Sequence, residues 1–307
     1  MSGKAAKRRF TISPSQLRAM ECRMQWFLGY HEGYRPRKSS DALELGKGLH
    51  AALDHFYSGG TNVVGFFHKW VDKRIKEIGS QWDDEVEAME KARDLGAGML
   101  EGYVEKYFHK DKFDVIATEK TLARRLPIPD KEGKFARCDV VVRLDGLVRC
   151  HETAKLFSLE HKSFSRFSLG DLETDQQFTA QVWVGQELAI QCGLDEPVVG
   201  VIYNGLRKQL PGPKVKLALF ERHKVYRNEA QIATFLNRAY WQYRETQLKS
   251  WPIFPQPSPM RCPRCDFNAP CTEMQRGGDY AFLLREQYTK RGQLPFPLAK
   301  DVEESDD

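Results

Sequence analysis

The sequence lacks several features that define large classes of protein. Of its 307 residues 41% are hydrophobic and 29% charged, yet no apolar run approaches the roughly 18 residues that a membrane-spanning helix needs. The N-terminal stretch MSGKAAKRRF is basic, but the apolar segment of an export signal does not follow it. We therefore expect a globular protein of the cytoplasm, with no membrane partner.

The phosphate loop of ATP-driven enzymes is also missing. No Gly-x4-Gly-Lys-Ser/Thr motif occurs, so the chain has no evident ATP motor, and any helicase activity would come from a separate partner. The net charge of +5 is weak support for a nucleic-acid partner. The basic residues 1–11 and the acidic end of residues 276–307 are expected to be solvated tails.

Cysteine is scarce, and its count is odd. Seven cysteines fit poorly with a disulfide framework, and in a reducing compartment clustered thiols more often bind metal. Three of them stand within ten residues, in CPRCDFNAPC at residues 262–271. Closed thiolate sites usually need four ligands. The fourth must therefore come from elsewhere in the chain.

The order of the elements that are present is typical of an α/β fold. Ser13 and Pro14 predict the start of a helix that carries Cys22. The first third of the chain is predicted to be helical, and short β-rich runs follow it. A helix that ends at Gly193 lies between two of the predicted strands, which indicates a crossover on one face of a sheet. Further helices are predicted at residues 40–57, 61–108, 172–194 and 228–251, and strands at residues 113–128, 134–146, 155–164, 196–206 and 214–226.

Two of these strands carry the residues most suited to catalysis. Glu160 and Lys162 lie two apart in LEHKS, so on a strand they share one face while His161 faces away. With Asp139 of RCDVVVR from the neighbouring strand, the carboxylates could bind Mg²⁺ or Mn²⁺, and Lys162 could position or help deprotonate a water. The same residue types on adjacent strands can equally form surface ion pairs.

Several short motifs together resemble the PD-(D/E)XK nuclease superfamily, in its RecB-like iron-sulfur exonuclease branch. The resemblance extends over about residues 12–275 and is to CRISPR-associated RecB-like exonucleases, their phage-encoded relatives and the nuclease domain of AddB. The motifs occur in the family's order: SPSQLRAMEC with Cys22, GKGLH with His50, a strand with Glu119, RCD with Asp139, LEHK with Glu160 and Lys162, a glutamine-bearing helix, and Cys-x2-Cys-x5-Cys.

The resemblance implies a restriction-endonuclease-like fold. In this α/β fold a mixed central sheet is flanked by helices, and a helical N-terminal region and a C-terminal cysteine lobe are added. A single nuclease domain would cover residues 12–275. Its parts would be a helical part at 12–110, a catalytic core at 111–227, and a helix with the iron-sulfur lobe at 228–275.

The same resemblance implies roles for individual residues. Asp139, Glu160 and His50 would bind the divalent cation together with the main-chain carbonyl of His161. Lys162 would orient the attacking water or neutralise the transition state. Glu119 would support a second metal or a water, although a glutamate on a strand surface would look the same.

A glutamine motif and the cysteines complete the implied site. The family usually shows Gln-x3-Tyr on the helix after the lysine. Gln177 fits the glutamine, but Gln181 then stands at the tyrosine position, and a register that starts at Gln181 meets Gly185 instead. The early and late cysteines would ligate one 4Fe-4S cluster, with Zn²⁺ as the chemical alternative. These cysteines are Cys22, Cys262, Cys265 and Cys271.

The function implied is a metal-dependent DNA exonuclease that acts on single-stranded or frayed ends. It would serve recombination, repair, or phage or CRISPR DNA processing, and a helicase or recombination protein is a candidate partner. A phage-encoded form would act in the host cytoplasm. Two alternatives stay open. One is a non-catalytic nucleic-acid-binding module that keeps the fold and the cluster. The other is a zinc-stapled protein-interaction domain whose carboxylates form surface ion pairs.

Overall fold

The computed structural model describes residues 10–78, 83–129, 138–210, 212, 219–248 and 250–290. Most of the expected basic tail, the acidic end and the start of the strand predicted at 214–226 lie outside these residues. The chain divides into two compact units. The sheet unit comprises Ser39–Leu122 and Val142–Ile232, and the cysteine unit comprises Met1–Lys38, Ala123–Val141 and Ala233–Asp307.

The sheet unit is built on a mixed sheet, as the sequence predicts. Strands β4, β5, β6 and β7 are neighbours in this order, and β3 also pairs with β4. The β4–β5 and β6–β7 pairs are antiparallel, whereas β5 and β6 are parallel and are joined by the predicted crossover helix. The strands are β3 (Phe113–Arg125), β4 (Cys138–Cys150), β5 (Leu156–Phe164), β6 (Val198–Arg207) and β7 (Phe220–Tyr226).

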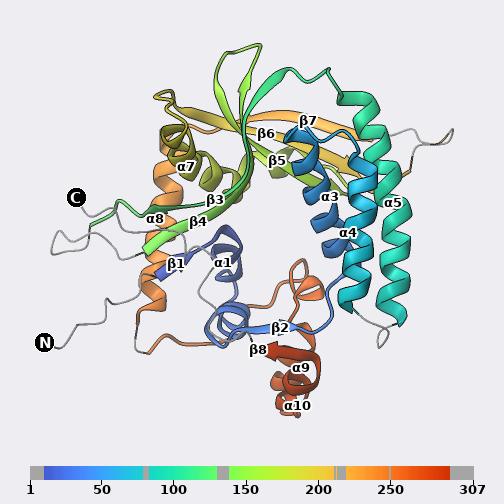
Figure 1. The fold of residues 1–307 in the computed structure, drawn as a ribbon. Coiled ribbons are helices and arrows are strands. Elements are labelled where there is room, and N and C mark those ends of the chain that lie inside the picture. Colours follow the sequence, from blue (N-terminus) through green and yellow to red (C-terminus); the bar gives the residue numbers. More distant parts are fainter. Residues whose placement is uncertain are drawn as a thin grey trace, which may run out of the picture. The chain divides into compact units, whose positions relative to one another are not determined.

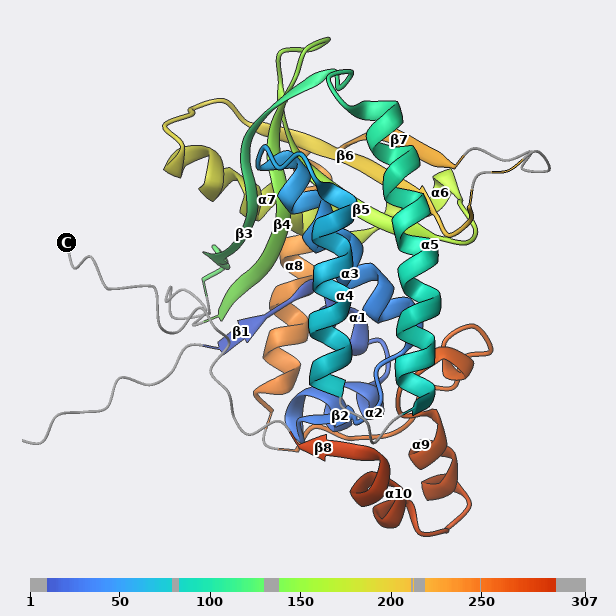
Figure 2. The same ribbon diagram turned by 45° about the vertical axis from the view of Figure 1, so that its right-hand side comes forward.

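Helices pack on both faces of this sheet (Figures 1 and 2). The crossover helix α7 (Gln176–Gln191) packs on β5 and β6, and it ends before Gly193, whose φ of 73° suits glycine. The short α6 (Leu169–Thr174) precedes it. On the other face α3 (Asp41–Tyr57) contacts β5 and α5 (Asp83–Tyr107) contacts β6, while α4 (Val63–Ile78) packs against both helices.

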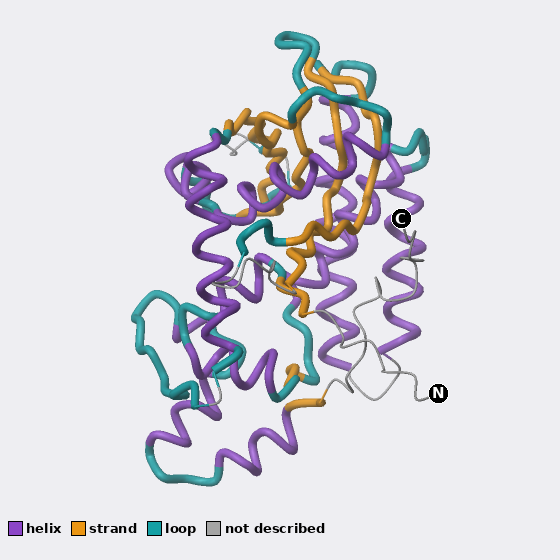
Figure 3. Tube along the Cα trace, turned by 90° about the vertical axis from the view of Figure 1, so that its left-hand side faces the viewer, coloured by secondary structure: helices purple, strands orange, loops and turns teal. Residues whose placement is uncertain are grey.

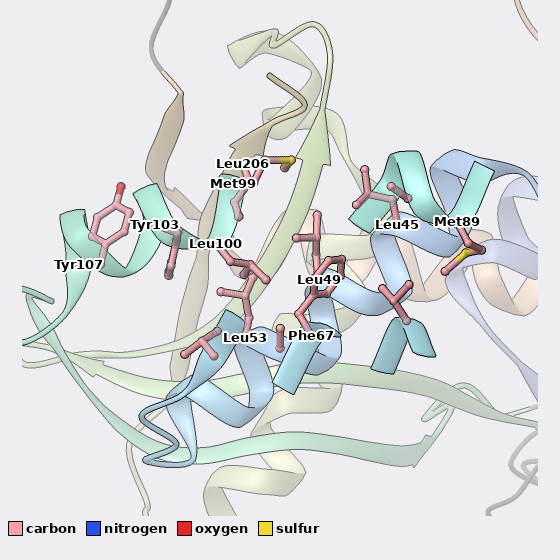
Figure 4. Packing of buried hydrophobic residues seen from close by; sticks show 14 residues of the cluster. Leu45, Leu49, Leu53, Phe67, Met89, Met99, Leu100, Tyr103, Tyr107 and Leu206 are labelled. Carbon is pink, nitrogen blue, oxygen red and sulfur yellow. The ribbon is translucent and has the colours of Figure 1, made fainter. Parts of the chain in front are cut away.

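Helices α3, α4 and α5 share an apolar core (Figure 4). Leu45, Leu49 and Leu53 recur four residues apart on α3 and are each at most 4% exposed, as expected for one buried helix face. They pack with Phe67 of α4 and Leu100 of α5. This packing fixes the rotation of α3, and with it the direction of the next residue after Leu49, which is His50.

The cysteine unit begins with the capped helix that the sequence predicts, but the helix is short. α1 (Pro14–Ala19) starts after Ser13, whose hydroxyl accepts a hydrogen bond from the main-chain N–H of Gln16. The predicted continuation through Cys22 is wrong, because Cys22 has an extended conformation with φ −133°. α2 (Arg23–Trp26) and a π-helical turn (Phe27–His31) follow it.

The break at Cys22 has a physical cause in the loop around Gln256. The main-chain N–H of Gln256 donates to the Cys22 sulfur at 3.4 Å, and its side-chain oxygen accepts from the N–H of Arg23 at 2.9 Å. These bonds replace the helical ones. Cys22 therefore faces the C-terminal loop, which is seen between α8 and the last helices in Figure 3.

The rest of the cysteine unit is helical, with two small pairs of strands. Strand β1 pairs in parallel with the start of β4, and β2 pairs antiparallel with β8. In the described part of the chain, no helix is long and apolar enough to cross a membrane. The bounds are β1 (Phe10–Ile12), β2 (Tyr34–Pro36), α8 (Glu229–Thr246), a 3₁₀ turn (Cys262–Arg264), α9 (Asn268–Gln275), α10 (Tyr280–Gln287) and β8 (Tyr288–Lys290).

Candidate active site

Glu160 lies at the centre of the candidate site in the sheet unit. Its side chain is only 2% exposed, on the face of β5 that α7 covers. Lys162, two residues further along the strand and on the same face, places its ammonium 2.5 Å from Glu160 Oε1. This neighbourhood is the one that strand alternation predicts for the two side chains. A surface ion pair would be exposed, whereas this carboxylate is buried.

Two glutamines of α7 donate to the same carboxylate. Gln177 Nε2 donates to Glu160 Oε1 at 2.8 Å, while Gln177 Oε1 accepts from Lys162 Nζ at 3.1 Å. Gln181, one helical turn later, donates through Nε2 to Glu160 Oε2. Both glutamines of the uncertain motif therefore reach the site, since residues four apart share a helix face.

The position of the Gln181 side chain lowers the stability of the fold, because one of its polar atoms is buried without a hydrogen bond. It is fully buried, and its Oε1 atom has no hydrogen-bond partner among the described residues. A buried unpaired acceptor costs roughly 1–3 kcal/mol. The bond from Gln181 Nε2 to Glu160 holds the amide in this orientation, which indicates that the arrangement serves the carboxylate rather than the core.

A second carboxylate, that of Asp145, joins the group from β4. Its Oδ1 lies 3.0 Å from His50 Nδ1, and its Oδ2 accepts a 2.7 Å hydrogen bond from the main-chain N–H of His161. Asp145 is 9% exposed, and its contact with the His161 N–H is buried, whereas the His50 side chain is partly exposed. His50 of α3, which the sequence analysis proposed as a metal ligand, is thus in the group, and so is the main chain of His161.

Asp139, the aspartate expected from the sequence, is not part of this group. It lies six residues before Asp145 on β4 and belongs to the cysteine unit, where its Oδ1 accepts from Arg125 Nε at 3.4 Å. The carboxylate beside Glu160 in the sheet unit is that of Asp145, so Asp145 takes the place of Asp139 in the proposal below. The alternation of a strand cannot separate the two, because residues six apart point to the same face.

Glu119 also lies apart from the group. On β3 it forms an ion pair with Arg143, whose side chain is 57% exposed. This is the strand-surface arrangement that the sequence left open as its alternative. The structure thus brings together Glu160, Lys162, Gln177, His50 and His161, and adds Asp145 and Gln181.

The two carboxylates differ in their electrostatic surroundings. Burial raises the pKa of Glu160, although the charge of Lys162 acts to lower it. For Asp145 burial is outweighed by the hydrogen bond and charge of His50, so the pKa of Asp145 is lowered. A group whose carboxylates are driven in opposite directions by burial and by specific partners is typical of functional sites.

The pKa values of Lys162 and His50 respond to these carboxylates. Burial acts to lower the pKa of Lys162, but the charge and hydrogen bond of Glu160 raise it overall, so Lys162 is held as an ammonium. In the same way Asp145 raises the pKa of His50 against the effect of burial. In this arrangement Lys162 is consequently a hydrogen-bond donor and a positive charge.

His161 itself faces away from Glu160, as predicted, and is neutral. Burial lowers the pKa of its imidazole to about 3. The ring stacks on Tyr57 with centroids 5.4 Å apart, and its Nδ1 lies 2.8 Å from Asn204 Nδ2.

This buried imidazole predicts a loss of stability in acid. Below about pH 6.5 the unfolded chain binds a proton at His161 that the folded chain does not, so the free energy of unfolding falls by up to about 1.4 kcal/mol per pH unit, down to about pH 3. The His161→Leu variant should lose this contribution and show a shallower decline between about pH 6 and about pH 4 in urea unfolding. Val148→Ala, which removes buried apolar volume only, should keep the wild-type slope at a lower stability. Parallel curves for the wild type and His161→Leu would contradict the prediction.

The donors at this site fit a hard divalent cation in their chemistry. Two carboxylates, an imidazole and a main-chain carbonyl are ligands of the kind that Mg²⁺ and Mn²⁺ accept. Among the described residues, however, no group of three or more His, Cys, Asp or Glu side chains is arranged so that it could hold a metal ion. Both Glu160 oxygens accept from Lys162, Gln177 or Gln181. A cation would have to replace at least one of these donors.

The four cysteines proposed as cluster ligands belong to one unit. Three of them, Cys22, Cys265 and Cys271, pack against an apolar cluster that includes Met24, Leu28 and Phe267. Three of the sulfurs accept N–H hydrogen bonds, from Gln256 to Cys22 at 3.4 Å, from Ser258 to Cys262 at 3.3 Å and from the Gln275 side chain to Cys271 at 3.5 Å. N–H donors to sulfur are also a feature of metal-bound thiolates and iron-sulfur clusters.

The electrostatics of these thiols connect them to one another. Burial raises the pKa of Cys265 and of Cys271, and the charge of Cys22 adds to both effects. The Cys262 charge raises the pKa of Cys271 further. Without a cation these effects favour neutral thiols, and the finding that no described group of three or more His, Cys, Asp or Glu is arranged to hold a metal ion includes these cysteines. By residue type alone, four cysteines are ligands of the kind that zinc or an iron-sulfur cluster accepts.

Comparison with known proteins identifies the family of the chain. The family model of the PD-(D/E)XK nuclease superfamily matches residues 11–272. Among solved structures, a candidate exonuclease from Eubacterium rectale is similar over 81% of this chain and 91% of its own, with 12% identity and a TM-score of 0.38. A search of curated proteins finds no match. Nucleases of this superfamily use divalent metals such as Mg²⁺ or Mn²⁺ and act on nucleic acids. On the family match, the chain belongs to the PD-(D/E)XK nuclease superfamily.

Proposed function

We propose that this nuclease is a metal-dependent DNA exonuclease that removes nucleotides from single-stranded or frayed ends. The observation that carries the proposal is the buried Glu160 carboxylate, which pairs with the half-buried Lys162 and is held by two glutamines beside the Asp145–His50 pair. A binding module has no chemical need for this arrangement. A protein-interaction domain would not require a carboxylate to be buried with a hydrogen-bonded ammonium, which costs desolvation energy.

Each residue has a role that follows from its surroundings. Asp145, Glu160 and His50, with the His161 carbonyl, would hold a divalent cation, and that cation would stabilise charge on the scissile phosphate and acidify an attacking water. Lys162, held as an ammonium, would donate to the water or to a phosphate oxygen. Gln177 orients Lys162 by accepting from its Nζ.

Residues that immediately follow Lys162 support a single-stranded substrate. The chain leaves β5 through Phe164, the exposed Arg166 and the half-buried Phe167. Phe167 stacks on His223 with centroids 5.0 Å apart, and Arg207 lies over Phe164 at 4.8 Å. Rings and guanidinium groups beside a nuclease centre suit unpaired bases and phosphates.

The iron-sulfur cluster belongs to the same proposal as a structural element. The hydrogen bonds to three of its four expected sulfurs support it, and so does the placement of all four cysteines in one unit. Such a cluster would join the N-terminal helices to the C-terminal lobe within the cysteine unit.

The proposed function predicts cleavage that depends on metal and on a free end. Protein purified without oxygen should release label from linear single-stranded DNA with Mg²⁺ or Mn²⁺, and EDTA or the Glu160→Ala substitution should abolish the release. Circular single-stranded DNA of the same sequence should stay intact, because it has no end. Labels at the 5′ and 3′ ends in separate reactions report the polarity.

Other outcomes would change the proposal in defined ways. Cleavage of the circle would show an endonuclease, and preference for RNA of the same sequence would replace the substrate class. If the wild type and Glu160→Ala were equally inert but bound DNA, the chain would be a binding module that keeps the nuclease fold.

A further inference from the structure

A polar network with a buried centre and a half-buried rim lies behind β5, on the face away from Glu160. Its members come from α3, α5, β5, β6, β7 and the turn before β3, all within the sheet unit. They are Tyr57, Tyr103, Asp111, His161, Asn204 and Arg222. Nothing in the catalytic arrangement above uses the side chains of this network.

The hydrogen bonds of the network form one connected set. Asn204 Nδ2 donates to Tyr103 Oη and lies 2.8 Å from both that atom and His161 Nδ1. Arg222 donates to Asn204 Oδ1 through Nε at 3.0 Å and through a second nitrogen at 2.9 Å. The same guanidinium donates to the hydroxyls of Tyr57 and Tyr103 and pairs with Asp111.

These bonds leave His161 only one arrangement. Because Arg222 occupies Asn204 Oδ1, the amide cannot turn round without placing its NH₂ against the guanidinium. Asn204 Nδ2 is therefore the donor, and His161 Nδ1 is the acceptor. The imidazole is thus fixed in position, rotation and tautomer, and Tyr57 stacks on its face.

The main chain of His161 touches the site that the side chain faces away from. Its N–H donates to Asp145 Oδ2 at 2.7 Å, and the residue separates Glu160 from Lys162. A ring held by the network from one side therefore sets the peptide that meets Asp145 on the other. Burying a guanidinium, an amide and two hydroxyls brings no stability that an apolar core would not supply as well.

We propose that this network positions the main chain of His161, whose N–H meets Asp145 and whose carbonyl is the proposed metal ligand, with Asn204 and Tyr103 as positioning residues for the cation site. The inference rests on the proposed site at Asp145 and Glu160. It assigns to the network the orientation of the peptide between the two catalytic residues, so its loss lowers metal affinity before it lowers the rate of chemistry.

Mn²⁺ binding by the full-length protein tests the network without relying on cleavage. Binding is measured by calorimetry, and only the Mn²⁺ binding that the Glu160→Ala substitution abolishes is assigned to the site. Asn204→Leu should weaken this binding roughly 10- to 100-fold, the range for residues that orient metal ligands, and Tyr103→Phe should weaken it roughly threefold or more. At saturating Mn²⁺ the kcat of Tyr103→Phe should return to within about threefold of the wild type.

Tyr107→Phe is the matched control for the central hydroxyl. Tyr107 lies one turn after Tyr103 on α5, with ring centroids 4.7 Å apart, and Arg222 lies over its ring at 3.8 Å. It contributes a ring but no hydroxyl bond to the network described above. Its Mn²⁺ affinity should stay within about twofold of the wild type.

The outcomes separate the network from the proposed function. Wild-type Mn²⁺ affinity in a folded Asn204→Leu, or in Tyr103→Phe if Asn204→Leu does not fold, would overturn the positioning role. An equal loss in Tyr107→Phe would also overturn it, because packing alone would then explain the effect. If the wild type bound Mn²⁺ without cleaving nucleic acid, the proposed function would fail. The comparison of Mn²⁺ affinities would still test the positioning role of the network. Absence of Glu160-dependent Mn²⁺ binding in the wild type would overturn both.

Discussion

Asp145→Asn is expected to reduce cleavage of single-stranded DNA by roughly 10³-fold or more, whereas Asp139→Asn should stay within about threefold of the wild type. The first change removes a buried carboxylate charge from the group that contains His50 and Glu160. A cation that stabilises phosphate charge would lose a ligand there. The second change alters a carboxylate whose partner is Arg125 in the cysteine unit.

The two variants are matched in chemistry and in strand, so they isolate position. Initial rates at saturating and at limiting Mn²⁺ should be measured for both, with circular dichroism and a thermal melt to show that each is folded. Asp145→Asn also leaves the His50 imidazole without its anionic partner, which should lower the pKa of His50. Full activity of Asp145→Asn, or a loss of roughly 10³-fold in Asp139→Asn, would reverse the assignment.

The aspartate could have been located from the sequence by counting back from a turn. β4 and β5 are antiparallel with Gly146 opposite Leu159, so the next pair outward is Asp145 with Glu160. The short turn between Cys150 and Leu156 fixes this register. The RCD motif indicates Asp139 instead. Strand alternation does not distinguish the two aspartates, since both occupy the same face of the strand.

Other parts of the site followed from local rules. The pairing of Glu160 with Lys162, and the turning away of His161, are consequences of strand alternation alone. The approach of Gln177 and Gln181 follows from helical spacing once α7 crosses from β5 to β6. These features were predictable because each depends on neighbours in sequence and on one known connection.

The buried network could not be predicted in the same way. Asn204 and Arg222 are ordinary strand residues in sequence, and Tyr103 sits in an amphipathic helix where an apolar role is expected. Their bonds depend on how helices and strands from distant parts of the sheet unit meet. The break in the helix at Cys22 was missed for a related reason, because the bonds from the Gln256 segment outweigh local helix propensity there.

Cys22→Ser is expected to remove most of the metal from the cysteine unit. Protein purified without oxygen should contain about four iron atoms per chain if all four thiolates hold one 4Fe-4S cluster. Cys22 is the only one of these ligands that precedes the sheet unit in sequence, so it alone ties the N-terminal helices to the C-terminal lobe. A crosslink that closes so long a stretch of chain stabilises the folded state by roughly 5 kcal/mol, and most of that contribution should be lost with the cluster.

Cys192→Ser is the matched control, since Cys192 is an exposed cysteine of the sheet unit and lies at the end of α7. It should keep the wild-type iron content and unfolding midpoint, both measured on the same preparations by elemental analysis and urea titration. About one zinc per chain in place of iron, still lost in Cys22→Ser, would make the cysteine site a zinc staple and leave its structural role intact. Two results would contradict a four-thiolate centre. If the wild type held neither iron nor zinc, none of the sulfurs would bind metal, and if Cys22→Ser kept its metal, the three C-terminal sulfurs would suffice.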